Sequence, residues 1–236
     1  MSLLLIPDIH GRNFWKNAVE KHFEDTSKTI FLGDYLDSYP WEGITRKEAI
    51  NNFQEIIDFK SENKDKVVLF VGNHDLAYID KKHYIVRSRY DSSNAYHIEE
   101  MFRSHRSFFQ LAHEELIGDK RYLFTHAGLQ KGWYDKHKKL IGELTIDGMN
   151  HLLDMPQGII ALCEASWSRG GWDQFGSIVW NDVTDCGSHV NDELPWDRQV
   201  FGHSQQEEHP IITDTHVCLD CRKAFILNDD GGFVEC

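Results

Sequence analysis

Short apolar runs recur in the first third of the chain, and each one ends in a turn that contains Asp or Asn. Residues 3–6, 29–32 and 67–71 contain only aliphatic residues, Thr and Phe. Runs of this length and composition are typical of buried strands. Ligands bind at the carboxyl ends of the strands in an open α/β sheet. We therefore expect the three turns to lie together at one sheet edge.

The segments between these runs have the apolar spacing of helices. In residues 13–24 the apolar side chains recur every three to four positions. In the second segment, Thr45 and Glu48 form the signature of a capping box, and periodic apolar residues follow it. Strand, helix and strand in this order predict βαβ units.

The rest of the chain alternates between helical and strand-like segments. Residues 76–115 indicate a mostly helical excursion with a break at 92–94. This excursion could cover the rim of a ligand site at the sheet edge, but we favour a helical segment that simply packs against the rest of the protein. Further on, we predict strands at 121–125 and 199–201 and helices at 130–153 and 156–163. Residues 167–180 indicate a loop with one short strand. At 210–234 we expect antiparallel strands that close a second sheet or extend the first. The predicted fold class is α/β, a two-sheet β-sandwich flanked by helices.

Length, charge and cysteine content narrow the class of protein. A chain of 236 residues, 41% of them hydrophobic, can bury one sizeable core, so we expect a single domain over residues 1–236. The formal net charge of −13 disfavours extended nucleic-acid binding, but not a small anion held by bound cations. The apolar start before Pro7 is too short for a secretory signal or a membrane span, and the five cysteines are an odd number. We expect a cytoplasmic protein with no membrane partner. The sequence carries no signal for an oligomeric state.

Six side chains at the predicted strand ends offer only oxygen and nitrogen donors. They are Asp8, His10, Asp34, Asn73, His126 and His203. Two divalent ions about 3.5–4 Å apart need about this many protein ligands if positions stay open for solvent and substrate. Carboxylate, amide and imidazole suit Mn, Fe, Ni or Zn better than Ca, and the absence of sulfur disfavours a closed structural zinc site. We expect two divalent metal ions, with Mn favoured.

These residues belong to five short motifs. The motifs are Asp8-x-His10-Gly11, Gly33-Asp34-x-x-Asp37, Gly72-Asn73-His74-Asp75, Thr125-His126-Ala127-Gly128 and Gly202-His203. Together they resemble the signature of the calcineurin-like metallophosphoesterases. The nearest branch contains serine/threonine phosphoprotein phosphatases, the bacteriophage protein phosphatase and bacterial diadenosine tetraphosphatases.

The resemblance implies a metal-binding role for each of the six side chains. Asp8 and His10 would hold one ion, and Asp34 would bridge both ions. The remaining side chains would hold the second ion: Asn73, His126 and His203. Water or hydroxide bridging the ions would attack phosphorus, because two cations lower its pKa.

The resemblance also implies a catalytic pair and an activity. His74 would donate a proton to the leaving group, and Asp37 would orient it. We expect a phosphomonoesterase similar to the serine/threonine phosphatases, acting on a small phosphorylated substrate or a phosphoprotein. A hydrolase of dinucleoside polyphosphates or cyclic nucleotides is the alternative enzyme. A non-catalytic protein-binding scaffold on the same fold is the alternative of another class, disfavoured because the ligands and both catalytic residues are present.

The chain departs from the family pattern where relatives bind the phosphoryl group. Ser38 stands where relatives have a phosphate-clamping Arg, and Asp182 follows Trp180-Asn181 where a second Arg often lies. Arg12 and Arg169 are the candidate substrate-binding residues in their place. A further arginine cluster could supply phosphate-binding charge, but interleaved acidic residues favour a solvated helix face. That cluster contains Arg87, Arg89, Arg103 and Arg106.

The pair Cys218-x-x-Cys221 is the one remaining pattern with possible chemistry. Two cysteines at this spacing could form half of a zinc knuckle. No second pair exists in the sequence, and Cys236 alone is a poor complement. The pattern therefore favours strand packing over metal binding.

Overall fold

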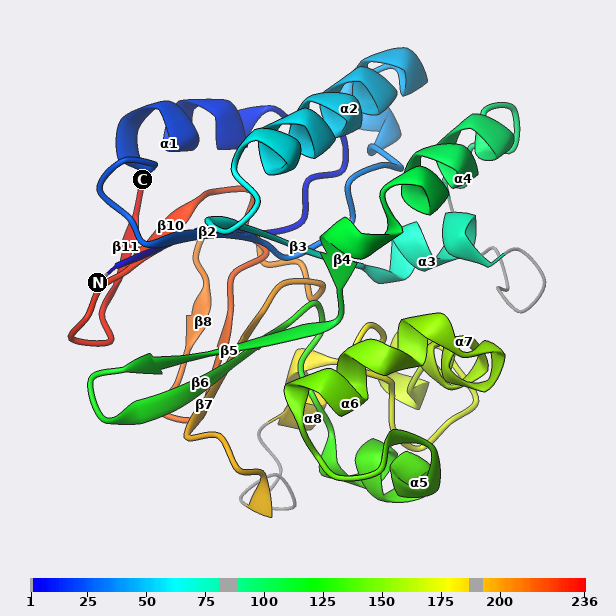
Figure 1. Ribbon diagram of the computed structural model, residues 1–236, viewed down its shortest axis with the longest axis vertical. Helices are drawn as coiled ribbons and strands as arrows, with labels where there is room; N and C mark the ends of the chain where they lie inside the picture. The colour runs from blue at the N-terminus through cyan, green and yellow to red at the C-terminus, as the bar shows by residue number, and fades with distance from the viewer. Residues whose placement is uncertain (1, 81–88, 187–192) are drawn as a thin grey trace. The chain divides into compact units, whose positions relative to one another are not determined.

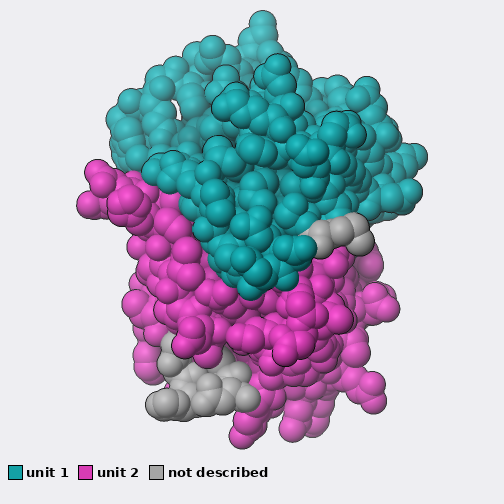
Figure 2. All heavy atoms as spheres, turned by 90° about the vertical axis from the view of Figure 1, so that its left-hand side faces the viewer, with its two compact units in different colours: residues 1–109, 222–236 teal, residues 110–221 magenta. Residues whose placement is uncertain are grey.

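The computed structural model describes residues 2–80, 89–186 and 193–236. The chain forms two compact units, one made of Met1–Phe109 with Arg222–Cys236 and the other of Gln110–Cys221 (Figure 2). The structure contains two β-sheets with helices flanking them. This mixed α/β architecture confirms the predicted fold class, while the expectation of a single domain stays a prediction.

The first unit is built on a six-stranded sheet. Its strand order is β11-β10-β1-β2-β3-β4. The strands β1, β2 and β3 are parallel, and their apolar side chains are buried, as is typical of parallel strands. In chain order the strands are β1 (Leu3–Ile6), β2 (Lys28–Phe31), β3 (Val67–Phe70), β4 (Phe109–Gln110), β10 (Phe225–Leu227) and β11 (Phe233–Glu235).

Among the described residues of this unit, four helices accompany the sheet, and α1 and α2 lie over the same face of it (Figure 1). They are α1 (Phe14–His22), α2 (Arg46–Glu62), α3 (Asn73–Ile79) and α4 (Ala95–Ser104). Thr45 and Glu48 form the predicted capping box of α2. Helix α4 begins directly after the predicted break at 92–94, whereas residues 81–88 lie outside the described part of the chain. The described part of the unit also contains two short 3₁₀ turns: η1 (Pro40–Glu42) and η2 (Arg106–Phe108).

The second unit contains a five-stranded sheet in the order β5-β6-β7-β9-β8. Its strands are β5 (Ala112–Ile117), β6 (Lys120–Thr125), β7 (Arg198–Phe201), β8 (Ile211–Ile212) and β9 (His216–Cys218). The β6/β7 and β7/β9 pairs are parallel. The helical elements are α5 (Lys131–Ile141), α6 (Ile146–Asn150), η3 (His151–Asp154), α7 (Pro156–Leu162), η4 (Trp167–Arg169) and α8 (Val183–Cys186). None of the described helices has the length and apolar content needed to span a bilayer.

Three predictions about elements were wrong in part. The end of the excursion at 76–115 forms strands β4 and β5, because β5 pairs along its whole length with β6 and this pairing overrides its helix-favouring Ala, Glu and Leu residues. The described residues of 167–180 contain a 3₁₀ turn and one isolated bridge from Ser166 to Asp173, but no strand. The strands predicted at 210–234 extend both sheets rather than one. Of these strands, β9 pairs with β7 in parallel and not in antiparallel orientation.

Candidate metal centre

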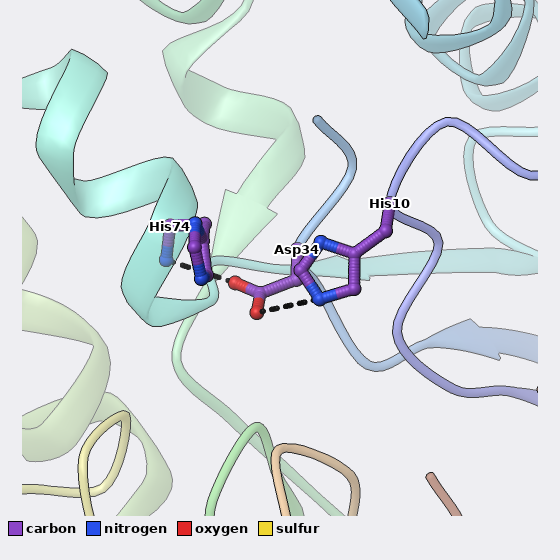
Figure 3. A group of neighbouring side chains, drawn as sticks. All are labelled: His10, Asp34 and His74. Carbon is purple, nitrogen blue, oxygen red and sulfur yellow. Dashed lines mark hydrogen bonds and ion pairs between the residues drawn. The ribbon is translucent and has the colours of Figure 1, made fainter. Parts of the chain in front are cut away.

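In the first unit, candidate ligands follow the ends of three neighbouring parallel strands. Asp8 and His10 follow β1, Asp34 follows β2, and Asn73 follows β3, with the candidate proton donor His74 directly after it. Nε2 of His10 lies 3.6 Å from Oδ2 of Asp34, and the backbone amide of His74 donates to Oδ1 of Asp34 at 2.9 Å (Figure 3). His10, Asp34 and His74 each offer a ligand atom within 4.8 Å of the others. The parallel sheet therefore brings carboxylate and imidazole donors to one edge, as predicted.

The backbone at this edge adopts a conformation that side chains with a Cβ rarely take. His10, Asp34 and Asp37 have φ angles of 44°, 54° and 58°. Such left-handed residues cost roughly 1–2 kcal/mol each and persist where surrounding contacts fix them. The amide of His10 donates to the carbonyl of Asp34 at 2.6 Å, which ties the two turns together. These turns are held in a strained shape that aims their side chains at a common point.

The buried carboxylate of Asp75 fixes the turn that carries Asp34. It accepts hydrogen bonds from the amides of Asp34 at 2.7 Å, Gly72 at 2.8 Å and Tyr35 at 3.0 Å. A Cβ at Gly72 would lie 2.2 Å from Oδ1 of Asp34, so only glycine fits at this position. The sequence showed Asp75 as part of a motif but gave no sign of this positioning role.

We expect Asp75→Asn to weaken Mn²⁺ binding by about 10- to 100-fold, the usual effect of removing a residue that orients a ligand. The new amide would turn a donor toward backbone donors and release the Asp34 turn. Mn²⁺ titration by calorimetry measures the change. Asp58→Asn removes the same charge from an exposed position on α2 and should bind Mn²⁺ like the wild type. Wild-type affinity in Asp75→Asn would contradict the positioning role.

His10 is fixed in the tautomer that a metal ligand requires. Its Nδ1 lies 2.9 Å from the carbonyl oxygen of Leu36. A carbonyl only accepts, so Nδ1 carries the proton and Nε2 presents its lone pair toward Asp34. Burial, with the positive charges of His74 and Arg89 adding to it, lowers the pKa of His10 well below its usual value. The imidazole is therefore neutral and able to coordinate a cation.

Asp34 has the electrostatic environment of a cation ligand. Burial raises the pKa of its carboxyl group well above the usual value, and the neighbouring carboxylates of Asp8 and Asp75 raise it further, against the opposing charge of His74. A divalent cation would offset this cost because it favours the ionised form. The buried oxygen and nitrogen donors of this edge therefore fit a divalent metal.

A second constellation on the same edge suits proton transfer. Nδ1 of His74 lies 2.7 Å from Oδ2 of Asp37, and the hydroxyl of Tyr78 donates to Oδ1 of Asp37. Burial and the charge of Asp37 raise the pKa of Tyr78, so its hydroxyl stays a donor. Sequence analysis missed Tyr78, although its place one helical turn after His74 puts both on one face of α3.

In the second unit, His126 and His203 follow the ends of the neighbouring parallel strands β6 and β7. Nε2 of His126 and Nδ1 of His203 lie 3.2 Å apart. His126 is buried, and His203 has a φ angle of 62°. The amide of Gly202 donates to the carbonyl of His126 at 2.8 Å and fixes the two turns side by side. Two imidazole nitrogens this close are well placed to share one metal ion.

The structure places both candidate substrate-binding arginines in ion pairs. Nη2 of Arg12 lies 2.9 Å from Oε1 of Glu42, and both residues line a pocket of about 680 Å³. Nε of Arg169 lies 2.9 Å from Oδ2 of Asp182. Arg12 also donates to the carbonyl of Asp8, and Arg169 to that of His203. Each arginine therefore braces the backbone of a candidate ligand while a carboxylate neutralises its charge.

The arginine cluster does not form one solvated helix face. Arg103 is exposed on α4 and pairs with Glu100, and Arg106 donates to the carbonyl of Phe109. Arg89 instead lies beside His74, with its Nη2 3.3 Å from Nε2 of the imidazole. Arg87 lies outside the described residues.

Cys218 lies in the core of the second unit. It belongs to a buried cluster with Cys186 and Phe201, and its thiol donates to the carbonyl of Gly202 at 3.2 Å. Within the described ranges, no group of potential metal ligands includes a cysteine. These contacts support the packing interpretation of the Cys218-x-x-Cys221 pattern.

Comparisons with known proteins place the chain among the phosphoesterases. A family model described as calcineurin-like phosphoesterase matches residues 1–207. A cold-active protein-tyrosine phosphatase from the psychrophile Shewanella sp. is 15% identical, with a TM-score of 0.56 and coverage of 99% of this chain and 80% of that chain. A protein serine/threonine phosphatase from Saccharomyces cerevisiae is 14% identical, with a TM-score of 0.58 and coverage of 100% and 79%.

At these identities the solved structures establish similarity of fold alone. The family match is stronger evidence because it covers most of the chain and all five motifs. The described structure adds buried carboxylate and imidazole groups of the kind that hold divalent metals. The chain therefore belongs to the calcineurin-like phosphoesterase family and is a metal-dependent hydrolase.

Proposed function

We propose that this protein is a dinuclear-metal phosphomonoesterase that acts on a small phosphorylated substrate or a phosphoprotein. The observation that carries the proposal is that two pairs of side chains lie next to each other within one unit. His10 and Asp34 are proposed to bind metal, and His74 and Asp37 are proposed to transfer a proton. The rings of His10 and His74 have centroids 5.1 Å apart, which supports a proposed cation ligand and a proposed proton donor acting on the same substrate group. The named activities of the fold neighbours, which dephosphorylate proteins, also support this class.

The proposed ligands are the six side chains that the family resemblance implies. Asp8, His10 and Asp34 would hold the first ion, and Asp34 would also bind the second. The pair His126 and His203 supports a second ion because its imidazole nitrogens already lie 3.2 Å apart; Asn73 would complete that position. We propose Mn²⁺, although Fe, Zn and Ni suit the same donors. When bound, two such ions supply Lewis-acid stabilisation and activate water at neutral pH.

The chain's own residues handle the proton. His74 would give the proton on Nε2 to the leaving oxygen, while Nδ1 keeps its proton in the hydrogen bond to Asp37. Asp37 orients the imidazole through this hydrogen bond, and Tyr78 holds Asp37 in place. After transfer the imidazole is neutral, and the product leaves as an alcohol and phosphate.

A hydrolase of dinucleoside polyphosphates or cyclic nucleotides is the second candidate, and one observation favours it. The ring of Tyr39 lies with its centroid 5.2 Å from that of His10, and the Trp41 ring packs on Tyr39 at 4.8 Å. Trp41 is 71% exposed. An exposed aromatic face beside the candidate metal ligands could stack on a nucleobase.

We expect hydrolysis of p-nitrophenyl phosphate to be lost on chelation and restored by Mn²⁺, because water is activated at neutral pH only when coordinated. The same assay should use bis-p-nitrophenyl phosphate, a phosphopeptide and a dinucleoside tetraphosphate. A preference for the monoesters would support the first candidate, and a preference for the diester or the tetraphosphate would support the second. Full activity in metal-free protein would contradict both.

A further inference from the structure

We propose that Arg89 is the residue that binds the phosphoryl group of the substrate in this protein. The inference rests on the proposed function and assigns a role at its site to a side chain that no motif contains. Ser38, at the rim of the same site, cannot serve as the clamp: its short hydroxyl donates to the carbonyl of Ile44 at 3.1 Å. A dianionic phosphoryl group is best held by the planar, paired donors of a guanidinium.

Arg89 is held with its guanidinium at the proton donor. Its Nε donates to the carbonyl oxygen of Asp37 at 2.7 Å, and its Nη2 lies 3.3 Å from Nε2 of His74. The central carbon of the guanidinium lies 3.7 Å from the centroid of the Tyr39 ring, close enough for a cation–π contact. A carbonyl on one side and an aromatic face on the other orient the plane of the group before any anion arrives.

The backbone beside Arg89 is anchored to the helix that carries His74. The ring of Tyr90 stacks on that of Tyr78 in α3 with centroids 4.7 Å apart. The amide of Asp91 donates to the hydroxyl of Tyr78 at 2.8 Å. Arg89 itself has a φ angle of 54°, a conformation that is unfavourable for a residue other than glycine and is concentrated at functional sites. Its place beside His74 is therefore fixed by several contacts.

Arg89 differs from the other arginines near candidate ligands in the charge of its partners. Arg12 and Arg169 are paired with carboxylates. Arg89 contacts a carbonyl, an imidazole and an aromatic ring, and among the described residues no carboxylate forms an ion pair with it. A guanidinium that keeps its full charge at the edge of a metal site is a site for an anion.

Anion binding also explains the contact with His74. A phosphoryl oxygen is a charged acceptor and attracts Nη2 more strongly than a neutral imidazole nitrogen does. When Nη2 turns to the anion, Nε2 of His74 is released to take up a proton from solvent, which it then gives to the leaving group. Nη1, which no described residue accepts from, would provide the second donor to the phosphoryl group.

The test compares Arg89→Ala and Arg89→Lys with the wild type, all loaded with Mn²⁺. Affinity for inorganic phosphate is measured by calorimetry, and kcat and KM are measured on p-nitrophenyl phosphate and on its bis ester. Arg89→Ala should weaken phosphate binding and raise KM for the monoester by about 10- to 150-fold, the strength of a hydrogen bond to a charged group. For the diester, which carries one charge less, kcat/KM should change less than about 5-fold.

Arg89→Lys should recover part of the phosphate affinity, because an ammonium supplies charge without paired donors. Arg103→Ala, an exposed arginine on α4, should match the wild type in every measurement. Metal content, measured in each variant, should not change. Wild-type phosphate affinity in Arg89→Ala would overturn the proposal, and so would equal losses for both esters, which would indicate a role in positioning His74.

The phosphate measurement separates this proposal from the proposed function. If the wild type hydrolyses neither ester but binds phosphate in an Arg89-dependent manner, the proposed function fails and the assignment of Arg89 stands. If the wild type is active and Arg89→Ala is unaltered, the assignment fails alone. A wild type that binds neither phosphate nor esters would overturn both.

Discussion

Asp34→Asn is expected to lower turnover of an aryl phosphate by at least about 10³-fold, because the metals contribute several kcal/mol to transition-state stabilisation. Asp34 is the residue proposed to bind both ions. In the structure, its Oδ2 approaches Nε2 of His10 and its Oδ1 accepts from the amide of His74. The amide of Asn would retain one oxygen but lose the negative charge that a cation requires. Turnover and metal content should therefore fall together.

The matched control for Asp34→Asn is Asp58→Asn, which removes one carboxylate from an exposed position on α2. Both proteins should be assayed at saturating Mn²⁺ after their thermal unfolding has been compared. Burial raises the pKa of Asp34, so its ionised form costs the folded protein free energy when no cation is bound. The metal-free variant should therefore be no less stable than the metal-free wild type. An active Asp34→Asn enzyme with full metal content would contradict the bridging role.

His74→Asn is expected to lower turnover by about 10²–10⁴-fold for esters with poor leaving groups, the usual contribution of a general acid. The effect should be much smaller for p-nitrophenyl phosphate, whose leaving group needs little protonation. In the structure, His74 is oriented by Asp37, which is held in turn by Tyr78. The measurement is a series of aryl and alkyl phosphates of increasing leaving-group pKa, assayed on variant and wild type.

Metal content separates acid catalysis from ligation at His74. It should stay near the wild-type value in His74→Asn, because the proposed ligand set does not contain this side chain. His97→Asn makes the same substitution at an exposed position on α4 and serves as the control. Equal losses for all leaving groups would show that His74 binds or positions the substrate instead. Loss of metal would make it a ligand.

Most of the sheet edge that carries the candidate metal ligands of the first unit could be predicted from the sequence. Strands β1, β2 and β3 are local apolar runs, and the turns after them contain residue types that are rare inside a core unless they have a partner. Their parallel pairing then places Asp8, His10, Asp34 and Asn73 at one edge. These features depend on local pattern and on one general rule of sheet topology, so a single sequence suffices to predict them.

The features that sequence analysis missed or disfavoured depend on long-range contacts. β5 has helix-favouring residues and becomes a strand through its pairing with β6. Arg89 is 15 positions from His74 in the chain, and the acidic residues interleaved with its arginine cluster, such as Glu99 and Glu100, suggest a solvated helix face rather than a site. Tyr78 is one of many buried aromatic residues and gains its role only through Asp37. No periodicity or spacing reports such contacts.

The most direct test of the account is the binding of Mn²⁺ to the metal-free protein, followed by electron paramagnetic resonance. A carboxylate that bridges two ions about 3.5–4 Å apart couples their electron spins. We expect about two Mn²⁺ per chain, a spin-coupled spectrum and phosphatase activity that rises with the coupled signal. In Asp34→Asn the coupled signal should disappear. Full activity in the metal-free protein, or activity without any coupled pair, would contradict a dinuclear phosphoesterase centred on Asp34.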